Sequence, residues 1–374
     1  MKPIVKSLHV QLNDIFDHLH ANPELSWKEK KTTAYLKQLL ERHGVRVNTF
    51  SDCTGLIAEI GSGQPVIAVR ADMDALSQEV NGVIQANHSC AHDAHMTIAV
   101  GVLLTLNNQN LPKGTIRFIF QPAEEVGNGA LKLVEKQVVD DVDYLYGVHL
   151  RPIQELKGGQ ATPAIIHGAG LFFKGKIIGE DTHGARPHLG VNAIEVGSTI
   201  VEQLKGIYLD PQVPYSVKMT KFQAGGEHAN IIPGSAVFSI DMRAQTNECL
   251  QQLRKKVENS IEAIEKLYDL EIQLQVLDYV PAAEVDKQAE AMMEAAILKV
   301  LGQENFVKPI VTSGGDDFHF YTIKRPHIKA TMLGLGANLT PGLHHPHMTF
   351  DRETILTGVE ILAHTVVNTL NVDN

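Results

Sequence analysis

The sequence predicts a two-domain α/β protein in which a small ferredoxin-like domain is inserted into a larger α/β domain. Three observations lead to this prediction. Short apolar strands alternate with amphipathic helices over residues 1–166. Residues 167–279 have the order strand, helix, strand, strand, helix, strand, which is typical of the split βαβ unit. Over residues 280–374 helices and short strands resume, so we expect this segment to complete the first sheet.

In the first domain, residues 4–19 place apolar side chains at helical spacing, which predicts an amphipathic helix. A second helix is expected to begin at Ser26, where Glu29 would complete a capping box, and to end at Gly44. Short β-branched segments predict strands at 55–60, 65–70, 115–120 and 144–149, with helices at 92–108 and 129–138 between them. In such sheets the functional residues are expected in loops at the strand ends.

In the inserted domain, the strands are predicted at 170–178, 215–223, 235–243 and 270–278. The first helix is expected over 191–208, and a long second helix carries apolar residues at helical spacing from Leu250 to Leu267. After the insertion, two further helices are expected at about 284–301 and 353–369.

Composition excludes several classes of protein. Among 374 residues, 33 Lys and Arg against 43 Asp and Glu give a formal net charge of −10, which argues against binding to nucleic acid or to an anionic membrane. Three scattered cysteines are too few for a disulfide framework. The N-terminus lacks the apolar stretch of a signal peptide, and no apolar run approaches the ~20 residues that span a bilayer. We therefore expect a cytoplasmic protein.

The 18 histidines are the unusual feature of the composition, and the densest cluster is HSCAHDAHM at 88–96. Cys90 and His92 are expected on one side of an extended segment, within reach of one ion and just before a helix N-terminus. Thiolate, imidazole and carboxylate donors together suit a divalent ion such as Zn, Mn, Ni or Co. The alternative is a buried cysteine beside surface histidines.

Three other segments supply donors at predicted strand ends. Glu124 and Glu125 follow the strand TIRFIF, so that one could bind a metal while the other acts as general base. His149 ends the strand YLYGVH, and His344 lies in the histidine-rich loop 341–351. The alternatives are a solvated acidic loop and histidines that are only hydrogen-bonded, but donors from several separate strand ends favour a metal site.

Asp72 and Asp74 end the strand that precedes this cluster, in the motif RADMDAL. They could be metal ligands or acceptors that fix the tautomer of His92, and we favour the second interpretation. Capping of the next helix is the alternative.

Taken in order, RADMDAL, SCAHDAHM, QPAEE, GVHLRP and GLHHPHMTFD resemble the motifs of metal-dependent amidohydrolases. These are the hippurate hydrolase, auxin-conjugate hydrolase and N-acetyldiaminopimelate deacetylase branch of the aminoacylase and zinc carboxypeptidase superfamily. The resemblance covers essentially the whole chain. It implies a zinc-exopeptidase-like α/β/α catalytic domain and an inserted lid that mediates homodimerisation. Three positions depart from the usual pattern, with Ala91 in place of Gly, Ser77 in place of Pro and Asp316 in place of Glu.

The resemblance also implies roles for individual residues. It implies two divalent metal ions per subunit, with five ligands: Cys90, His92, Glu125, His149 and His344. Glu124 takes the place of the general base. In the inserted domain, His183 would polarise the scissile carbonyl from its own or a partner subunit, Asn230 would contact substrate, and Arg243 would bind a substrate carboxylate.

The function expected from these residues is hydrolysis of the amide bond of an N-acyl amino acid or a related small amide by a metal-activated water. A dipeptidase or carboxypeptidase with the same centre is the nearest alternative. A binding protein without catalysis is another. A thiol amidase with Cys90 as nucleophile and His92 as base is the third.

Overall fold

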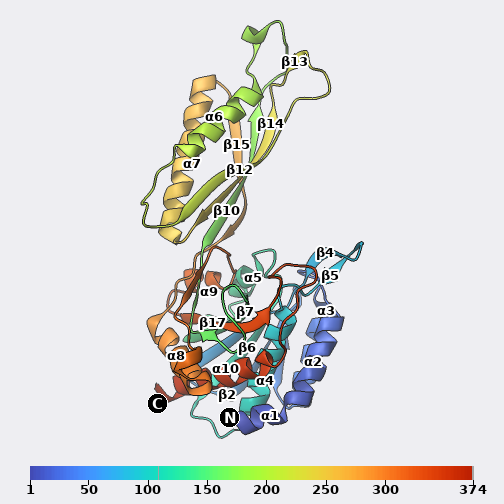
Figure 1. The fold of residues 1–374 in the computed structure, drawn as a ribbon, viewed down its shortest axis with the longest axis vertical. Coiled ribbons are helices and arrows are strands. Elements are labelled where there is room, and N and C mark those ends of the chain that lie inside the picture. Colours follow the sequence, from blue (N-terminus) through green and yellow to red (C-terminus); the bar gives the residue numbers. More distant parts are fainter. Residues whose placement is uncertain (108, 373–374) are drawn as a thin grey trace. The chain divides into compact units, whose positions relative to one another are not determined.

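The computed structural model describes residues 1–107 and 109–372, which form two compact units, each with its own hydrophobic core (Figure 1). Unit 1 comprises Met1–Ile166, Glu284–Val311 and Asp317–Asn374, and unit 2 comprises His167–Ala283 and Thr312–Asp316. The short segment 312–316 lies with unit 2 because the Gly168 N–H donates to the carbonyl groups of Thr312 and Gly314.

Unit 1 is built on a mixed seven-stranded sheet. The strands follow one another across it in the order β1 (Arg46–Thr49), β2 (Leu56–Ser62), β6 (Gly114–Gln121), β3 (Val66–Asp72), β7 (Tyr144–Pro152), β17 (Lys329–Leu339) and β8 (Ala161–Thr162). The four central strands β6, β3, β7 and β17 are parallel, and the flanking pairs are antiparallel. The chain passes from β3 to β6 on one side and then from β6 to β7 on the other side of β3, and such a reversal of strand order opens a crevice at the carboxyl ends of the strands.

Helices cover both faces of this sheet. Alternate residues of β3 point to opposite faces, so Ile67, Val69 and Ala71 enter the main core while Arg70 faces the other side. The core side is packed by α2 (His9–Ala21), α4 (His92–Asn107), α8 (Lys287–Leu301) and α10 (Thr354–Val372). The remaining helices of unit 1 are α1 (Lys2–Ser7), α3 (Lys30–Arg42), α5 (Gly129–Glu135) and α9 (His319–Lys324). The predicted α/β class of this domain is therefore confirmed.

The predicted start of the second helix is wrong. Helix α3 begins at Lys30, and Glu29 stands at its N-cap without a side-chain capping bond. The Ser26 hydroxyl donates instead to Asp74 (2.6 Å), and the Glu29 carboxylate accepts from the backbone N–H of Ala123 (2.9 Å). Both side chains of the apparent capping box are therefore used by distant parts of the chain, because buried carboxylates need donors that the local helix end does not supply.

Unit 2 has the βαββαβ element order that the sequence predicts. Its antiparallel sheet has the order β12 (Tyr215–Ala224), β14 (Ala236–Ala244), β10 (Ala169–Ile178) and β15 (Glu271–Val280). Helices α6 (Ala193–Lys205) and α7 (Asn247–Tyr268) pack against it, and the side chains of Asn192 and Thr246 cap them. A two-stranded ribbon, β11 (Thr182–His183) with β13 (Ile231–Ile232), is added to this plan.

A hairpin of β4 (Leu76–Val80) and β5 (Val83–Asn87) is absent from the predicted strands. Its turn is Asn81-Gly82, with φ of 54° and 81°, which is the conformation that Asn-Gly favours between two strands. This dipeptide was therefore the signal that could have located it. Two short strands, β9 (Ile165–His167) and β16 (Ile310–Thr312), complete the strands of the structure.

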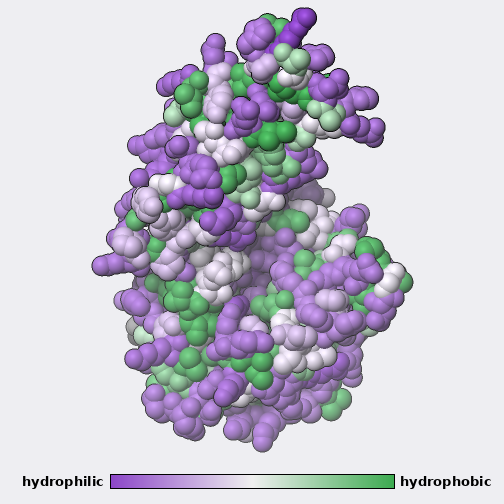
Figure 2. All heavy atoms as spheres, turned by 45° about the horizontal axis from the view of Figure 1, so that its top comes forward, coloured by the Kyte–Doolittle hydropathy of each residue, from purple (hydrophilic) through white to green (hydrophobic). Residues whose placement is uncertain are grey.

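The visible surface is mainly hydrophilic (Figure 2). Figure 2 shows one face of the molecule, on which hydrophilic residues predominate and hydrophobic ones occur in small groups. Among the described residues, none of the helices combines the length and the apolar character needed to cross a lipid bilayer.

Candidate metal centre

The predicted donors of unit 1 lie at the carboxyl ends of its parallel strands. Glu124 and Glu125 follow the end of β6, and His149 lies near the end of β7. His344 is in the loop after β17, and His92 is the first residue of α4, with Cys90 just before it. This is the edge at which α/β sheets bind ligands, so the topology alone brings the donors together.

Their ligand atoms form overlapping groups. One atom from each of Cys90, His92 and His149 lies within 4.8 Å of the others, and the same holds for Cys90, Glu125 and His344. Cys90 belongs to both groups. A third such group contains His92, Glu124 and Glu125. The structure therefore brings all five predicted ligands and the predicted base into one place.

The hydrogen bonds of two histidines leave one ring nitrogen free for a cation. His92 Nδ1 donates to the carbonyl oxygen of Asp74 (2.8 Å), and His149 Nδ1 donates to the carbonyl oxygen of Leu150 (2.7 Å). In the neutral rings the Nε2 atoms then carry the lone pairs, which is how a bond to one nitrogen selects the nitrogen that binds metal. His149 Nε2 lies 3.7 Å from Cys90 Sγ.

Two buried atoms at the centre of the cluster lack a hydrogen-bond partner, namely His92 Nε2 and Glu125 Oε1. They lie 3.7 Å apart, and Glu124 Oε2 is 3.8 Å from the same nitrogen, which is too far for a hydrogen bond. Buried polar atoms are rarely left unsatisfied. A divalent cation would satisfy both, and the set of thiolate, imidazole and carboxylate donors fits one.

The electrostatics of the cluster point the same way. Burial and the charge of Glu125 raise the pKa of the Cys90 thiol well above its usual range. Burial also raises the pKa of Glu125 to about 7, against the attraction of His92. Cysteine and glutamate bind metal in their deprotonated forms, so these groups hold protons that a bound cation would displace.

The segment between Cys90 and His92 is not extended as predicted. Ala91 has a φ of 62°, in the left-handed region, and its N–H lies near the His88 carbonyl, so that the chain turns directly into α4. Left-handed backbone costs about 1–2 kcal/mol for a residue with a Cβ. This explains why glycine suits the position, and Ala91 still delivers both neighbouring donors.

The two aspartates at the end of β3 support the site through hydrogen bonds, and Asp72 also belongs to a further donor group, with His92 and His95. The Asp74 carboxylate accepts from the backbone N–H groups of Glu124 (3.1 Å) and Glu125 (3.0 Å). Asp72 Oδ1 accepts from His95 Nδ1 (2.7 Å), and His95 Nε2 accepts from the Leu150 N–H (3.0 Å). Both nitrogens of His95 are therefore occupied, and the ring fixes the backbone beside His149.

The hairpin β4–β5 supports the His344 loop. Gln78 donates to the carbonyl oxygen of His344 (2.7 Å), and Asn87 donates to that of Pro346 (3.0 Å). The His344 N–H donates to the Ser89 carbonyl (2.8 Å), so this left-handed residue, with a φ of 63°, is held from both sides. These supporting residues were not predicted, because hairpin and loop are more than 250 residues apart along the chain.

Arg70 was also missed, although it stands in the RADMDAL motif. Its side chain is fully buried and donates to Asp72 (2.6 Å), Asp317 (2.8 Å) and Gln121 (2.9 Å). An arginine inside an otherwise apolar strand was the available signal, since a buried charge requires partners. Asp317 has no such local signal.

Replacing Arg70 by methionine is expected to lower the free energy of unfolding of unit 1 by about 3–5 kcal/mol, because Asp72 and Asp317 would be left buried without a counter-charge. Urea unfolding can be followed by the fluorescence of Trp27, the single tryptophan, which lies in unit 1. The control is Arg325→Met, which removes a half-exposed pair with Asp140 and should cost no more than about 1 kcal/mol. Equal losses in the two variants would contradict the structural role given to Arg70.

In unit 2, the structure places two of the three predicted substrate residues side by side. His183 pairs with Ile231 in the ribbon β11–β13, and the neighbouring Gly184 N–H donates to the Asn230 carbonyl (2.7 Å). The Ala185 N–H donates to His183 Nδ1 (3.0 Å), so the exposed ring presents Nε2–H as a donor. Arg243 lies apart, on β14, where it pairs with Asp241 (2.8 Å) and stacks over Phe172 (4.7 Å to the ring centroid).

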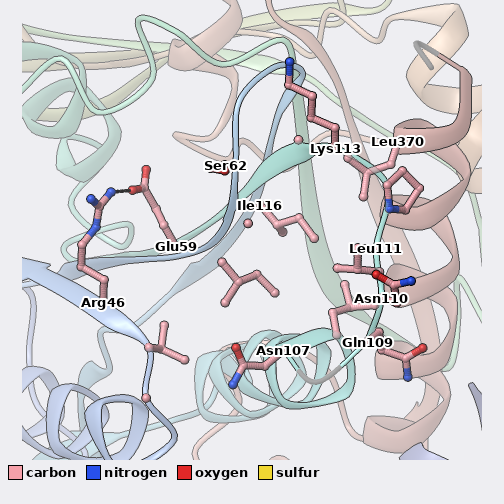
Figure 3. Close-up of a pocket in the computed structure, with 17 residues that line it drawn as sticks. Arg46, Glu59, Ser62, Asn107, Gln109, Asn110, Leu111, Lys113, Ile116 and Leu370 are labelled. Atoms are coloured by element: carbon pink, nitrogen blue, oxygen red, sulfur yellow. Dashed lines mark hydrogen bonds and ion pairs between the residues drawn. The ribbon is translucent and has the colours of Figure 1, made fainter.

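A cavity of about 570 Å³ lies away from these donors (Figure 3). It is bordered by the amino end of β6, by β2 and by the preceding loop, the opposite end of the parallel strand from Glu124. Arg46 and Glu59 point toward each other in it and form an ion pair. None of its described lining residues is a cysteine or histidine, so it does not compete as a metal site.

Residues 68–368 match peptidase family M20/M25/M40, a span that includes every candidate donor. The chain belongs to this family. The predicted resemblance to metal-dependent amidohydrolases is thereby confirmed, and so is the prediction of a hydrolase.

Relatives in the M20 family include an N-acetyl-L-cysteine deacetylase of Bacillus subtilis, 31% identical over 94% of this chain and 86% of its own. IAA-amino acid hydrolase ILR1-like 4 of Arabidopsis thaliana is 32% identical over 83% of this chain and 75% of its own. An N-acyl-L-amino acid amidohydrolase of Geobacillus stearothermophilus is 35% identical over 67% of this chain and 70% of its own.

Solved structures agree with this assignment. A Bacillus subtilis protein described as a dinuclear metal binding peptidase from the M20 family has a TM-score of 0.83 at 29% identity, over 98% of this chain and 99% of its own. A Staphylococcus aureus protein described as a putative aminohydrolase has a TM-score of 0.89 at 27% identity, over 99% of both chains.

Proposed function

We propose that this M20 hydrolase cleaves the amide bond of N-acyl amino acids at a centre of two divalent metal ions. The observation that carries the proposal is the arrangement of donors into two groups that share Cys90. Relatives named for N-acetyl-L-cysteine and N-acyl-L-amino acids support the substrate class, and the neighbour described as a dinuclear metal binding peptidase supports the metal count.

Cys90, His92 and His149 would hold one ion, and Cys90, Glu125 and His344 the other. Mn, Zn, Ni and Co all suit this mixed donor set. Bound there, divalent cations supply Lewis acidity, which lowers the pKa of a water and polarises the amide carbonyl. The chain's part is to present the Nε2 lone pairs of its histidines and to hold, through Asp74, the turn that carries Glu124 and Glu125.

Glu124 is proposed as the general base. It lies in a donor group with His92 and Glu125 but outside the two groups that contain Cys90, so its carboxylate is available for proton transfer. Its side chain is 13% exposed, which lets it meet a water or a substrate atom. It takes a proton from the attacking water and delivers it to the leaving amine.

The residues of unit 2 would contact the substrate. His183 offers Nε2–H to the oxyanion that forms at the scissile carbonyl, a type of contact worth about 3–4 kcal/mol. Asn230 would contact the substrate next to it, and Arg243, held by Asp241 and Phe172, would bind a carboxylate. We also propose that unit 2 is a ferredoxin-like lid that forms the homodimer, for which the edge strand β12 offers a pairing surface, and that the protein is cytoplasmic.

The thiol amidase is disfavoured by the site itself. A nucleophilic cysteine needs a lowered pKa, whereas burial and Glu125 raise the pKa of Cys90. A dipeptidase or carboxypeptidase would use the same centre, and it is separated from the proposed function by substrate alone.

Removal and return of metal test the proposal. Chelation should abolish hydrolysis, and reloading the apoprotein with Mn, Zn, Co or Ni should restore it, with two ions bound per chain. The panel of substrates sets N-acetyl amino acids against dipeptides of the same residues, and faster hydrolysis of the N-acetyl series is expected. Activity that survives complete chelation, or tight ligand binding without turnover after reloading, would refute the proposal.

A further inference from the structure

The turn that carries Glu124 and Glu125 is held by hydrogen bonds to two buried carboxylates. The N–H groups of Glu124 and Glu125 donate to Asp74, and the preceding N–H, that of Ala123, donates to Glu29 Oε1 (2.9 Å). Ala123 has a φ of 55°, so this residue needs a partner that keeps it in the left-handed region. Three consecutive backbone N–H groups, those of residues 123–125, therefore donate to buried carboxylates.

Glu29 is itself held firmly. Its side chain is fully buried, and Oε2 accepts from the Thr54 hydroxyl (2.6 Å). Its carbonyl oxygen accepts from the N–H (2.9 Å) and the hydroxyl (2.6 Å) of Thr33 in the first turn of α3. Through its backbone carbonyl and its carboxylate, Glu29 thus links the start of a helix to the turn that carries Glu124 and Glu125.

The packing around the turn leaves little room for movement. A Cβ at Gly55 would lie 2.7 Å from the Pro122 ring, and a Cβ at Gly129 would lie 1.7 Å from the Pro122 carbonyl oxygen. The Gly129 N–H donates to the Ala123 carbonyl (3.1 Å). Because Gly55 and Gly129 both lie close to Pro122, the turn has little room to shift, and the hydrogen bond from Ala123 to Glu29 is one of the contacts that hold it.

We propose that Glu29 is a positioning residue, which aims Glu124 and Glu125 by holding the N–H of Ala123. This inference rests on the proposed function, because it concerns the base and one donor of that same centre. Burial raises the pKa of Glu29, so the charged carboxylate is costly at this position. The Glu29 side chain makes no capping bond to α3, so helix capping does not explain why a glutamate stands here.

The test uses the full-length protein and three readouts: kcat and KM for an N-acetyl amino acid, Co²⁺ titration followed by absorbance, and thermal stability. Glu29→Ala is expected to lower kcat by about 100-fold with little change in KM, since small displacements of catalytic groups cost that much. It should also weaken binding of the second Co²⁺ by about tenfold, as does the loss of other groups that orient metal ligands without binding the metal. Glu29→Gln keeps an acceptor for Ala123 and should restore both.

The matched control is Val366→Ala, a fully buried side chain on α10 in the same unit. It should lower thermal stability while leaving kcat and Co²⁺ binding unchanged. If Glu29→Ala does not fold, Glu29→Asp takes its place, because the shorter side chain withdraws the carboxylate from Ala123.

The inference is overturned if the Glu29 variant keeps wild-type kcat and second-ion affinity, or if Val366→Ala loses both to the same extent at equal stability. A wild-type protein that binds fewer than two Co²⁺ and hydrolyses no N-acyl amino acid would instead overturn the proposed function, and the inference with it. The two failures are therefore distinguished by the wild-type titration.

Discussion

Glu124→Gln is expected to bind two metal ions and to lower kcat by about 10²–10⁴-fold, the usual contribution of a general base. The amide has the size of the carboxylate but cannot accept the proton of the attacking water. Metal content should be retained, because Glu124 is absent from both donor groups that contain Cys90. The measurements are kcat on an N-acetyl amino acid and the metal content by elemental analysis.

The control for this variant is Glu135→Gln, which changes an exposed carboxylate on α5 that pairs with Lys132. It should leave kcat and metal content unchanged. If Glu124→Gln turned over substrate at the wild-type rate, the proton would have to be taken by another group, and the assignment of the base would be wrong.

Cys90→Ala is expected to abolish the binding of both ions, because one sulfur atom serves both donor groups. We expect apparent metal affinity to fall by more than about 100-fold, the upper end of the loss caused by removing a contact outside the donor set. Activity should disappear with the metal. Metal content after dialysis and activity after reloading measure the two losses.

Cys249→Ala is the matched control, since Cys249 is a buried free cysteine of unit 2 that belongs to none of the donor groups found among the described residues. The result also separates the thiol amidase from the metal enzyme. In a thiol amidase, Cys90→Ala would lose activity, but the activity of the wild-type protein would survive removal of metal by a chelator. Retention of two ions by Cys90→Ala would contradict the shared-donor arrangement.

The sequence located most of the elements because their patterns are local. Helix α7 repeats buried residues at Leu250, Leu253, Val257, Ile261 and Ile264, which is one face of a helix whatever surrounds it. The order of strands and helices likewise depended only on periodicity and turn residues. The start of α3 was wrong because distant contacts decided it, since its apparent capping residues bind Asp74 and Ala123. The hairpin β4–β5 was missed although its Asn81-Gly82 turn is a local signal.

The candidate donors were also predicted from residue types at strand ends, without knowledge of which would meet. Of the groups that hold them, Asp72 and Asp74 were expected as hydrogen-bond acceptors, but the others were not predictable. Arg70, His95 and Glu29 act through hydrogen bonds to residues between 2 and 247 positions away, and no spacing rule relates such partners. The left-handed conformations of Ala91 and Ala123 were equally unpredictable, because a positive φ is common for glycine but not for alanine.

By itself, the sequence determined the α/β class, the βαββαβ element order and the set of candidate cysteine, histidine and glutamate donors, since each follows from short-range periodicity or from side-chain chemistry. Only the tertiary structure decided that Cys90 belongs to two donor groups and that buried carboxylates hold the turn beside it. Those features depend on the crossing of strands and on which buried charges find partners, and both are set by contacts between segments far apart along the chain.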